Sequence, residues 1–189
     1  MNVLMLTRYD RLGASSRVRF IQYLPWLQAK DVDVTVAPFF SNDYVRDLQV
    51  NKKNKFEVLK AFTSRLCTLL SNRSFDLLWI EKEALPWVPA VLEFAFLPKS
   101  IPYVLDYDDA VFHHYDQNSN FLVKKLLGDK HATLMRGAAL VVAGNSYIAD
   151  FAQKAGAKRV EIVPSVIDLD RYQVQDSILR ELAFATPRV

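Results

Sequence analysis

Six short apolar runs, separated by polar turns and helical patterns, constrain the fold of this chain more than any other feature of its sequence. The runs lie at residues 2–7, 32–37, 76–81, 104–109, 139–143 and 160–163. Several are apolar throughout, which is typical of strands that are buried on both faces in a parallel sheet. Strands that alternate with helices, with no hairpin signal between them, predict an α/β fold with a doubly wound, mostly parallel sheet and helices on both faces.

Between the runs, apolar residues recur at helical spacing. They predict helices at residues 17–29, 56–72, 87–97, 121–135 and 146–155, and residues 41–55 predict a loop or a short helix. Pro25 lies inside the first helix, so that helix either kinks there or has a different boundary. Gly128 weakens the fourth helix, and Gly156 is expected to end the fifth as a C-terminal cap. The segment 87–97 predicts a wholly buried helix or, as the alternative, one that rests on a membrane surface.

The composition is that of an ordinary globular protein. The chain has 189 residues, of which 51% are hydrophobic and 24% charged, so we expect one well-buried domain. The formal net charge of +3 is spread along the chain, and no nucleic-acid partner is expected. Cys67, the single cysteine, predicts a buried thiol in a reducing compartment. No run is long enough to span a membrane, so we expect a cytoplasmic protein, with peripheral contact to the cytoplasmic face of a membrane as an option.

Acids and histidines follow the fourth run at the point where the strand should end. They are Asp106, Asp108, Asp109, His113 and His114. In an open parallel sheet the carboxyl ends of the strands face the ligand crevice. Carboxylates this close repel one another, so at least one pKa should rise unless a cation or a ligand compensates. The acids therefore predict a general base or metal ligands, with helix caps and salt-bridge partners as the structural alternative, and His113 adds an acid–base group.

A small-residue loop joins the first strand to the first helix. It consists of Gly13, Ala14, Ser15, Ser16 and Arg17. Backbone amides at a helix N-terminus attract an anion, and either serine can cap the helix. The Gly-x-Gly-x-x-Gly pattern of dinucleotide-binding proteins is absent. The loop predicts either a structural turn or, with several arginines nearby, a segment that closes over a diphosphate.

Two further groups of residues follow strands on either side of the fourth run. Glu81 and Glu83 end the third run, and Asn145, Ser146 and Tyr147 follow the fifth. Because these ends meet at one edge of the sheet, we expect these side chains to face the same crevice, where the glutamates suit hydrogen bonding to a polyol acceptor. The alternatives are salt bridges to Lys82 or an arginine for the glutamates, and helix capping by Ser146.

Taken in order, these segments resemble the N-terminal half of a type B glycosyltransferase, and more specifically that of the retaining family 4 enzymes. The resemblance rests on residues 6–8 with 13–17, 76–83, 106–110, 141–147 and 163–172. It implies a Rossmann-like acceptor-binding domain at residues 1–166. It also implies that residues 167–189 are an interdomain linker and the start of a donor-binding domain that is missing from this sequence.

The resemblance also implies a reaction, in which a sugar passes from a nucleotide-sugar donor to a saccharide or lipid-linked acceptor during polysaccharide or glycolipid assembly. The loop containing Gly13, Ala14, Ser15 and Arg17 is expected to approach the donor diphosphate. Asp108, Asp109 and His113 are expected to border the transferred sugar and the acceptor hydroxyl. No metal and no cofactor besides the nucleotide-sugar co-substrate is expected, and this half alone is expected to be inactive because the donor side lies in the missing domain.

Two other classes of protein fit parts of the sequence. In a magnesium-dependent phosphatase of the haloacid-dehalogenase type, Asp106 would be the nucleophile and Asp108 the acid–base group. Against that reading, Ala110 stands where a threonine is usual, and the acids follow the fourth strand instead of the first. The other alternative is a non-catalytic, doubly wound binding module, whose acids hold a ligand or another chain.

Overall fold

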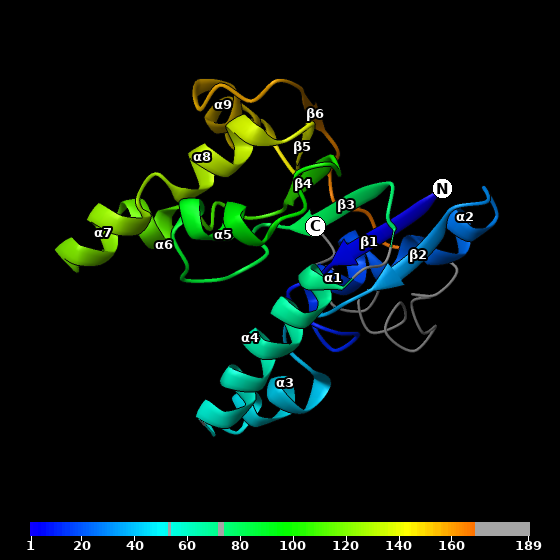
Figure 1. Ribbon diagram of the computed structural model, residues 1–189, viewed down its shortest axis with the longest axis horizontal. Helices are drawn as coiled ribbons and strands as arrows, with labels where there is room; N and C mark the ends of the chain where they lie inside the picture. Colours follow the sequence, from blue (N-terminus) through cyan, green and yellow to red (C-terminus); the bar gives the residue numbers. More distant parts are fainter. Residues whose placement is uncertain (53, 72–73, 169–189) are drawn as a thin grey trace, which may run out of the picture.

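A sheet of six parallel strands forms the centre of the computed structural model, which describes residues 1–52, 54–71 and 74–168 (Figure 1). The strands are β1 (Asn2–Leu6), β2 (Asp33–Val36), β3 (Leu77–Glu81), β4 (Tyr103–Tyr107), β5 (Leu140–Ala143) and β6 (Val160–Ile162). Their order is β2-β1-β3-β4-β5-β6, and every neighbouring pair is parallel. The predicted strands and the predicted α/β class are confirmed. Of the predicted linker and domain start at residues 167–189, everything from residue 169 onward lies outside the described residues.

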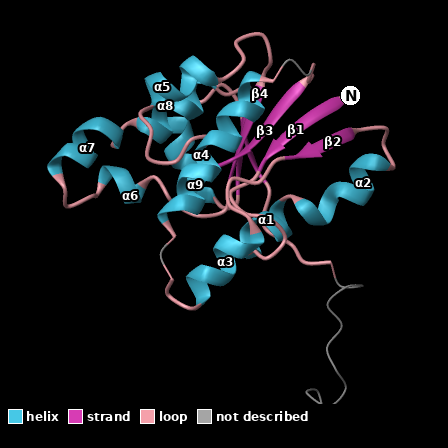
Figure 2. Ribbon diagram, turned by 60° about the horizontal axis from the view of Figure 1, so that its bottom comes forward, coloured by secondary structure: helices cyan, strands magenta, loops and turns pink. Residues whose placement is uncertain are grey.

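Helices cover both faces of the sheet, as predicted. On one face lie α4 (Lys55–Leu70), α5 (Ala90–Phe96), α8 (Lys130–Gly137) and α9 (Ser146–Lys154), which contact one another in that order. The β1-to-β2 crossover runs along the sheet in the opposite direction from the later ones. Because such crossovers are right-handed, its helices α1 (Ala14–Arg19) and α2 (Leu24–Gln28) lie on the other face. In Figure 2 the strands run between α2 on one side and α5 and α8 on the other.

The core follows the alternation of side chains along the strands. Leu4, Leu78 and Leu105 point into the large core cluster beneath α4, α5, α8 and α9. The residues between them face the other way, where the rings of Phe20 and Trp79 lie 5.1 Å apart. Both faces of the central strands are therefore covered.

Two predicted helices are each divided in the structure. The predicted helix 17–29 is wrong in its boundaries, because α1 ends at Arg19, a 3-10 turn covers Ile21–Tyr23, and α2 begins at Leu24. Pro25 lies in the first turn of α2, where the missing amide hydrogen costs nothing. The predicted helix 121–135 is α7 (Phe121–Leu127) followed by α8, with Gly128 between them.

The loop regions contain two short helices. Residues 41–55 include α3 (Asn42–Gln49), which Ser41 caps by accepting from the Tyr44 amide. The polar stretch after β4 includes α6 (His113–Asp116), where the sequence predicted only a loop. Gly156 has a φ of +85° just beyond α9, which confirms the predicted C-terminal cap.

Two predictions of burial were wrong. The predicted helix 87–97 is the shorter α5, which buries Ala90 and Glu93 on one face, whereas Val91 points outward and is 77% exposed. Cys67 is exposed because it lies two residues from both Arg65 and Leu69, the α4 residues that face the sheet. None of the helices in the described part of the chain is long and apolar enough to cross a membrane.

Candidate functional site

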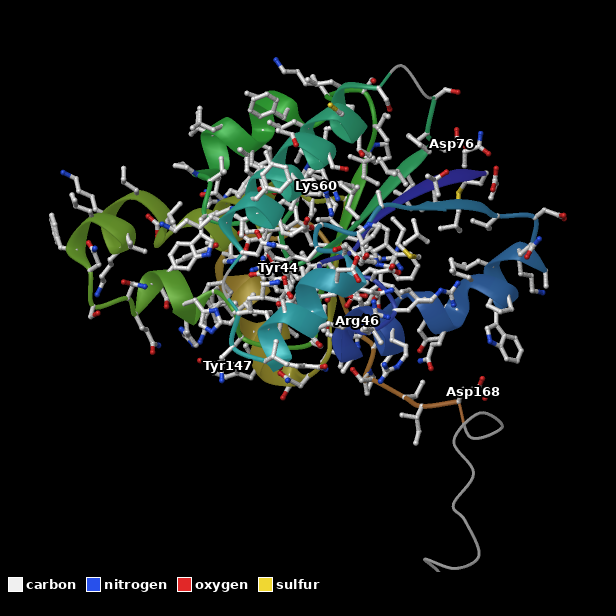
Figure 3. The ribbon with its side chains drawn as sticks, turned by 90° about the horizontal axis from the view of Figure 1, so that it is seen from below. Tyr44, Arg46, Lys60, Asp76, Tyr147 and Asp168 are labelled. Atoms are coloured by element: carbon white, nitrogen blue, oxygen red, sulfur yellow. The ribbon has the colours of Figure 1, made fainter. Side chains whose placement is uncertain are left out.

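The carboxyl ends of β1, β3, β4 and β5 bring the predicted site residues to one edge of the sheet. The loop after β1 leads into α1, Glu81 ends β3, and Asp106 lies near the end of β4. Figure 3 shows Tyr147, which follows β5, on the opposite side of the molecule from Asp76, which precedes β3. The polar residues thus gather at the edge where open α/β sheets bind ligands.

Glu81 fixes the loop between β1 and α1. Its carboxylate is almost fully buried and accepts hydrogen bonds from the Arg8 amide at 2.7 Å and the Ser16 hydroxyl at 2.6 Å. The Ser15 hydroxyl lies 2.9 Å from Glu81 and 2.5 Å from Asp108, and its single hydrogen bonds to one of the two carboxylates at a time. The Tyr9 amide in turn donates to the Ser16 hydroxyl at 3.0 Å. The predicted cap by either serine is wrong, because Gly13 is the N-cap of α1 and the serines bond to Glu81 instead. Glu81 therefore faces this loop and not the solvent.

Gly13 is the residue that lets this loop close. A Cβ atom at this position would lie 2.3 Å from the Cβ of Tyr9, which is closer than real side chains approach. The Gly13 amide donates to the Asp10 carbonyl at 2.9 Å, which completes the turn. Ala14 is exposed, and Arg17 is half-buried and donates to the Arg11 carbonyl at 3.3 Å. Ala14 and Arg17, which the sequence assigned to the loop, thus lie in the first turn of α1.

Asp108 joins this loop to the end of β4. It accepts from the Ser15 hydroxyl at 2.5 Å and lies 2.8 Å from Nζ of Lys82. Burial disfavours a charge on Asp108, but Lys82 and the Ser15 hydrogen bond outweigh it and lower the pKa of the carboxyl. Asp109 lies 3.5 Å from the same Nζ, and its side chain is 72% exposed. Both acids pair with Lys82, but the Asp108 side chain is only 18% exposed, whereas Asp109 offers its carboxylate to solvent.

Lys82 is a site residue that the sequence did not single out as one. Its φ of +66° lies in the left-handed region, which is strained for a side chain of this kind. Burial opposes its charge, but Asp108 and the neighbouring acids raise the pKa of its amine. The Tyr107 hydroxyl donates to the Lys82 carbonyl at 2.7 Å and holds this conformation. The left-handed backbone conformation at Lys82 thus places its ammonium group between Asp108 and Asp109.

Asp106 is enclosed within the sheet. It is almost fully buried and accepts from Nε of Arg19 at 2.6 Å. Burial raises the pKa of Asp106 to about 6, although the Arg19 cation pulls it down. A phosphatase nucleophile must reach its substrate, and Asp106 has no such access. Within the described ranges, no group of three His, Cys, Asp or Glu side chains lies together.

A buried network of charges lies beneath the edge. Glu83 accepts from Arg8 Nη1 at 3.0 Å and from Nζ of Lys130 at 2.6 Å, and the Tyr115 hydroxyl lies 3.1 Å from it. Nζ of Lys130 also lies 2.9 Å from Glu93, which accepts from the Ala84 amide. The sequence signal for this network was charged residues at inward positions of otherwise apolar helices, which are rarely buried unless they are paired.

His131 lies inside the same network. It is 1% exposed, and its Nδ1 lies 2.9 Å from the Tyr107 hydroxyl. Because the phenol hydrogen is donated to the Lys82 carbonyl, Nδ1 must be the donor in this contact. Burial lowers the pKa of His131 to about 4, so the ring is neutral.

The β5 end contributes an exposed aromatic residue. Asn145 caps α9 by accepting from the Ile148 amide at 3.0 Å, so the predicted cap by Ser146 is wrong. Asn145 and Ser146 are both exposed. The hydroxyl of Tyr147, the next residue, lies 2.7 Å from Nε2 of His113. The structure thus connects two predicted parts of the site, the histidine after β4 and the segment after β5, through Tyr147.

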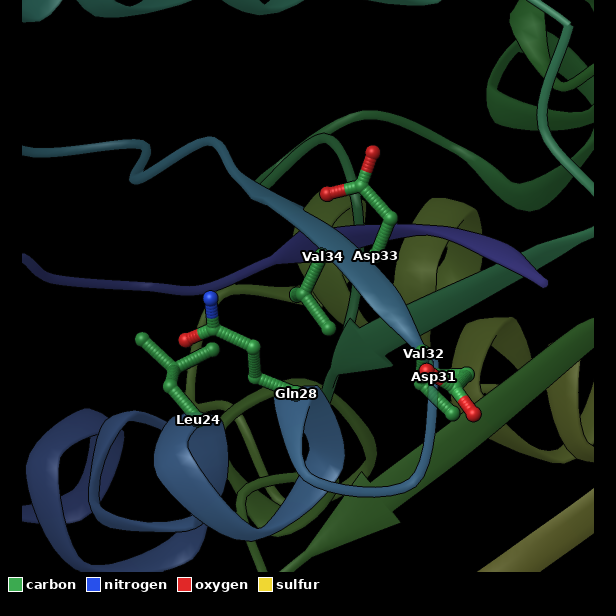
Figure 4. A pocket seen from close by; sticks show the side chains of 6 residues that line it. All are labelled: Leu24, Gln28, Asp31, Val32, Asp33 and Val34. Atoms are coloured by element: carbon green, nitrogen blue, oxygen red, sulfur yellow. The ribbon is translucent and has the colours of Figure 1, made fainter.

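A hollow of about 540 Å³ lies away from this edge, between α2 and β2. In Figure 4 Leu24 and Gln28 extend from α2 toward Val34 of β2. None of the predicted site residues lines this hollow. The candidate site is therefore the polar carboxyl edge of the sheet. No family model matches the chain, and no curated protein matches it.

Replacing Glu81 should loosen the loop between β1 and α1. Glu81→Gln keeps the shape but replaces a charged acceptor of two hydrogen bonds, so we expect the free energy of unfolding to fall by about 2 kcal/mol. Hydrogen exchange should accelerate at the amides of Arg8 and Tyr9. Glu161→Gln, in an exposed pair on β6, should change neither quantity. Unchanged exchange in Glu81→Gln would contradict the role given to this carboxylate.

The stability should depend on pH through His131. Its folded pKa of about 4 lies below the ordinary 6.5, so the stabilisation from the neutral ring is complete above pH 6.5 and is lost as the pH falls toward 4. The loss should reach about 3 kcal/mol by denaturant titration at each pH. His131→Phe should flatten this change relative to the wild type, whereas exposed His114→Phe should retain it. Parallel curves for the wild type and His131→Phe would exclude this cause.

Proposed function

We propose that this chain is the acceptor-side domain of a glycosyltransferase that moves a sugar from a nucleotide-sugar to a saccharide or lipid-linked acceptor. One observation carries the proposal, the 2.5 Å hydrogen bond between Ser15 and Asp108. It joins the loop expected to approach the donor diphosphate to the acids expected to border the sugar, although the two lie 93 residues apart in the chain. Two features that the sequence assigned to one cleft are thus in direct contact.

The chemistry of this edge suits sugar transfer. Such a reaction needs the acceptor hydroxyl held against the anomeric carbon while the leaving phosphate is stabilised. The exposed carboxylate of Asp109 can accept a hydrogen bond from a sugar hydroxyl, and Lys82 supplies a cation beside it. The amides of Arg8, Tyr9 and Gly13 already donate within the protein, so under this proposal donor binding depends mainly on a second domain.

A surface on α7 supports a lipid-linked acceptor. Phe121, Leu122 and Leu126 are exposed on this short helix, and Phe121 is 71% exposed. Lys124 and Lys125 lie among them and form no ion pair within the part of the chain that the structure describes. In Figures 1 and 2, α7 lies at the opposite extreme of the molecule from β2. Apolar side chains interspersed with lysines suit a membrane with anionic headgroups, so we place the protein at the cytoplasmic face of a membrane.

Acceptor binding by the 189-residue chain tests the function. In NMR titrations with a panel of saccharides, we expect the amide signals of Asp109 and Asn145 to shift. Asp109→Asn should weaken binding about tenfold, because a charged hydrogen-bond acceptor is lost. Its free energy of unfolding should stay within about 0.5 kcal/mol of the wild type, because the side chain is exposed.

The matched control is Asp33→Asn, an exposed acid at the start of β2 and thus at the opposite edge of the sheet. This variant should bind the saccharides as the wild type does. Shifts confined to the hollow between α2 and β2, or equal losses in both variants, would refute the proposed site.

Vesicle binding tests the surface on α7. The protein should float with phosphatidylcholine vesicles that contain phosphatidylglycerol, and replacing Phe121, Leu122 and Leu126 by serine should weaken this binding by about tenfold or more. Leu59→Ser on α4 removes a leucine that is similarly exposed and should have no effect. Equal binding by the triple variant and the wild type would show that α7 does not contact the membrane.

A further inference from the structure

Three side chains at the β4 and β5 ends form a continuous line of hydrogen bonds. Nδ1 of His113 lies 2.9 Å and 3.1 Å from the two oxygens of Asp116, and its Nε2 lies 2.7 Å from the Tyr147 hydroxyl. His113 and Asp116 share one face of α6, whereas Tyr147 belongs to the first turn of α9. An imidazole held between a carboxylate and a hydroxyl is an arrangement that moves protons.

The carboxylate determines which nitrogen of His113 carries the hydrogen. A carboxylate only accepts, so Nδ1 must donate to Asp116, and Nε2 then accepts from the Tyr147 phenol. The side-chain nitrogen of Gln117 also lies 2.8 Å from Nδ1 and can donate to it only in the other tautomer. In that tautomer Nε2 would carry the hydrogen and would not accept a proton from Tyr147. The two tautomers therefore differ in the role of Nε2, which accepts a hydrogen bond from Tyr147 when Nδ1 carries the hydrogen and cannot accept one otherwise.

The backbones at the β4 and β5 ends, which lead into this line, approach each other closely. A Cβ atom on Gly144, the residue directly after β5, would lie 3.1 Å from Cα of Asp108. The buried ring of Phe112 stacks on Phe151 at 3.7 Å and lies 4.6 Å from the His113 ring, so the imidazole rests on a firm base. Tyr147 is 57% exposed. Its hydroxyl is thus the end of the line that a substrate can reach.

We infer that Tyr147 is a catalytic acid–base residue and that His113 and Asp116 are positioning residues that activate it. The inference rests on the proposed function for the identity of the substrate, a sugar hydroxyl. The acceptor hydroxyl gives its proton to Tyr147 Oη, while the phenol proton passes to Nε2 of His113 and Asp116 stabilises the imidazolium. The acceptor oxygen bonds to the anomeric carbon, and the bond from that carbon to the donor diphosphate breaks with its electron pair leaving on the diphosphate.

Two measurements on the 189-residue chain test the line without any transfer reaction. Nitrogen-15 NMR of the imidazole should show the hydrogen of His113 on Nδ1, and Asp116→Asn should reduce the population of this tautomer. An aryl sulfonyl fluoride probe should label Tyr147 at least about fivefold faster than the half-buried Tyr23, because the hydrogen shared with His113 makes the phenol oxygen more nucleophilic.

His113→Phe keeps an aromatic ring on Phe112 and removes the proton acceptor, so labelling of Tyr147 should fall about fivefold. Asp150→Asn, an exposed acid on α9, is the matched control and should not change the rate. A hydrogen on Nε2 in the wild type, or equal labelling of Tyr147 in the wild type and His113→Phe, would overturn the inference.

Repeating the labelling with saccharide present separates this inference from the proposed function. Protection of Tyr147 by saccharide, together with labelling that depends on His113, supports both. If Tyr147 is labelled fast and this rate depends on His113, but no saccharide slows it, then the tyrosine is activated and the proposed sugar acceptor is refuted. If saccharides shift the NMR signal of Asp109 but the labelling of Tyr147 is slow, then the acceptor site is retained and the role of Tyr147 is overturned.

Discussion

The buried carboxylate of Glu81 is the interaction on which the carboxyl edge of the sheet depends. A buried charge is costly unless donors satisfy it, and here the donors are the Arg8 amide of the loop after β1 and the Ser16 hydroxyl at the start of α1. The loop is therefore fixed by the need to solvate one anion. Ser15 extends the constraint to Asp108, so a single residue of β3 sets the relative positions of the β1 loop and the β4 end.

Charges at this edge are arranged by depth. The inner acids, Asp106 and Glu83, are paired with Arg19, Arg8 and Lys130, and breaking such pairs would leave uncompensated charges. The outer groups, Asp109 and Tyr147, are exposed. The inner pairs hold the edge rigid, and the outer groups are left to meet a ligand, which is how a binding site is preorganised.

The sequence predicted the strands and the edge where the polar residues gather, because apolar runs that end in acids follow from local pattern alone. It did not predict which of those residues are buried. The glutamates after the third run were expected to face a crevice, yet Glu81 and Glu83 take partners that are distant in the chain, such as Lys130 at a separation of 47 residues. The pairing of His113 with Asp116 was missed for another reason. Residues three apart lie on the same side only in a helix, and the polar stretch gave no helical pattern.

The guanidinium of Arg19 has a consequence for the way the chain leaves the sheet. Besides Asp106, it bonds to the Val163 carbonyl at 2.7 Å and the Ser165 hydroxyl at 3.2 Å, just beyond β6. A displacement of that segment therefore acts on the ion pair between Arg19 and Asp106 and not on β6 alone. Displacing the segment would remove two acceptors that hold this guanidinium beside Asp106. The position of the exit segment is therefore coupled to an ion pair between α1 and β4.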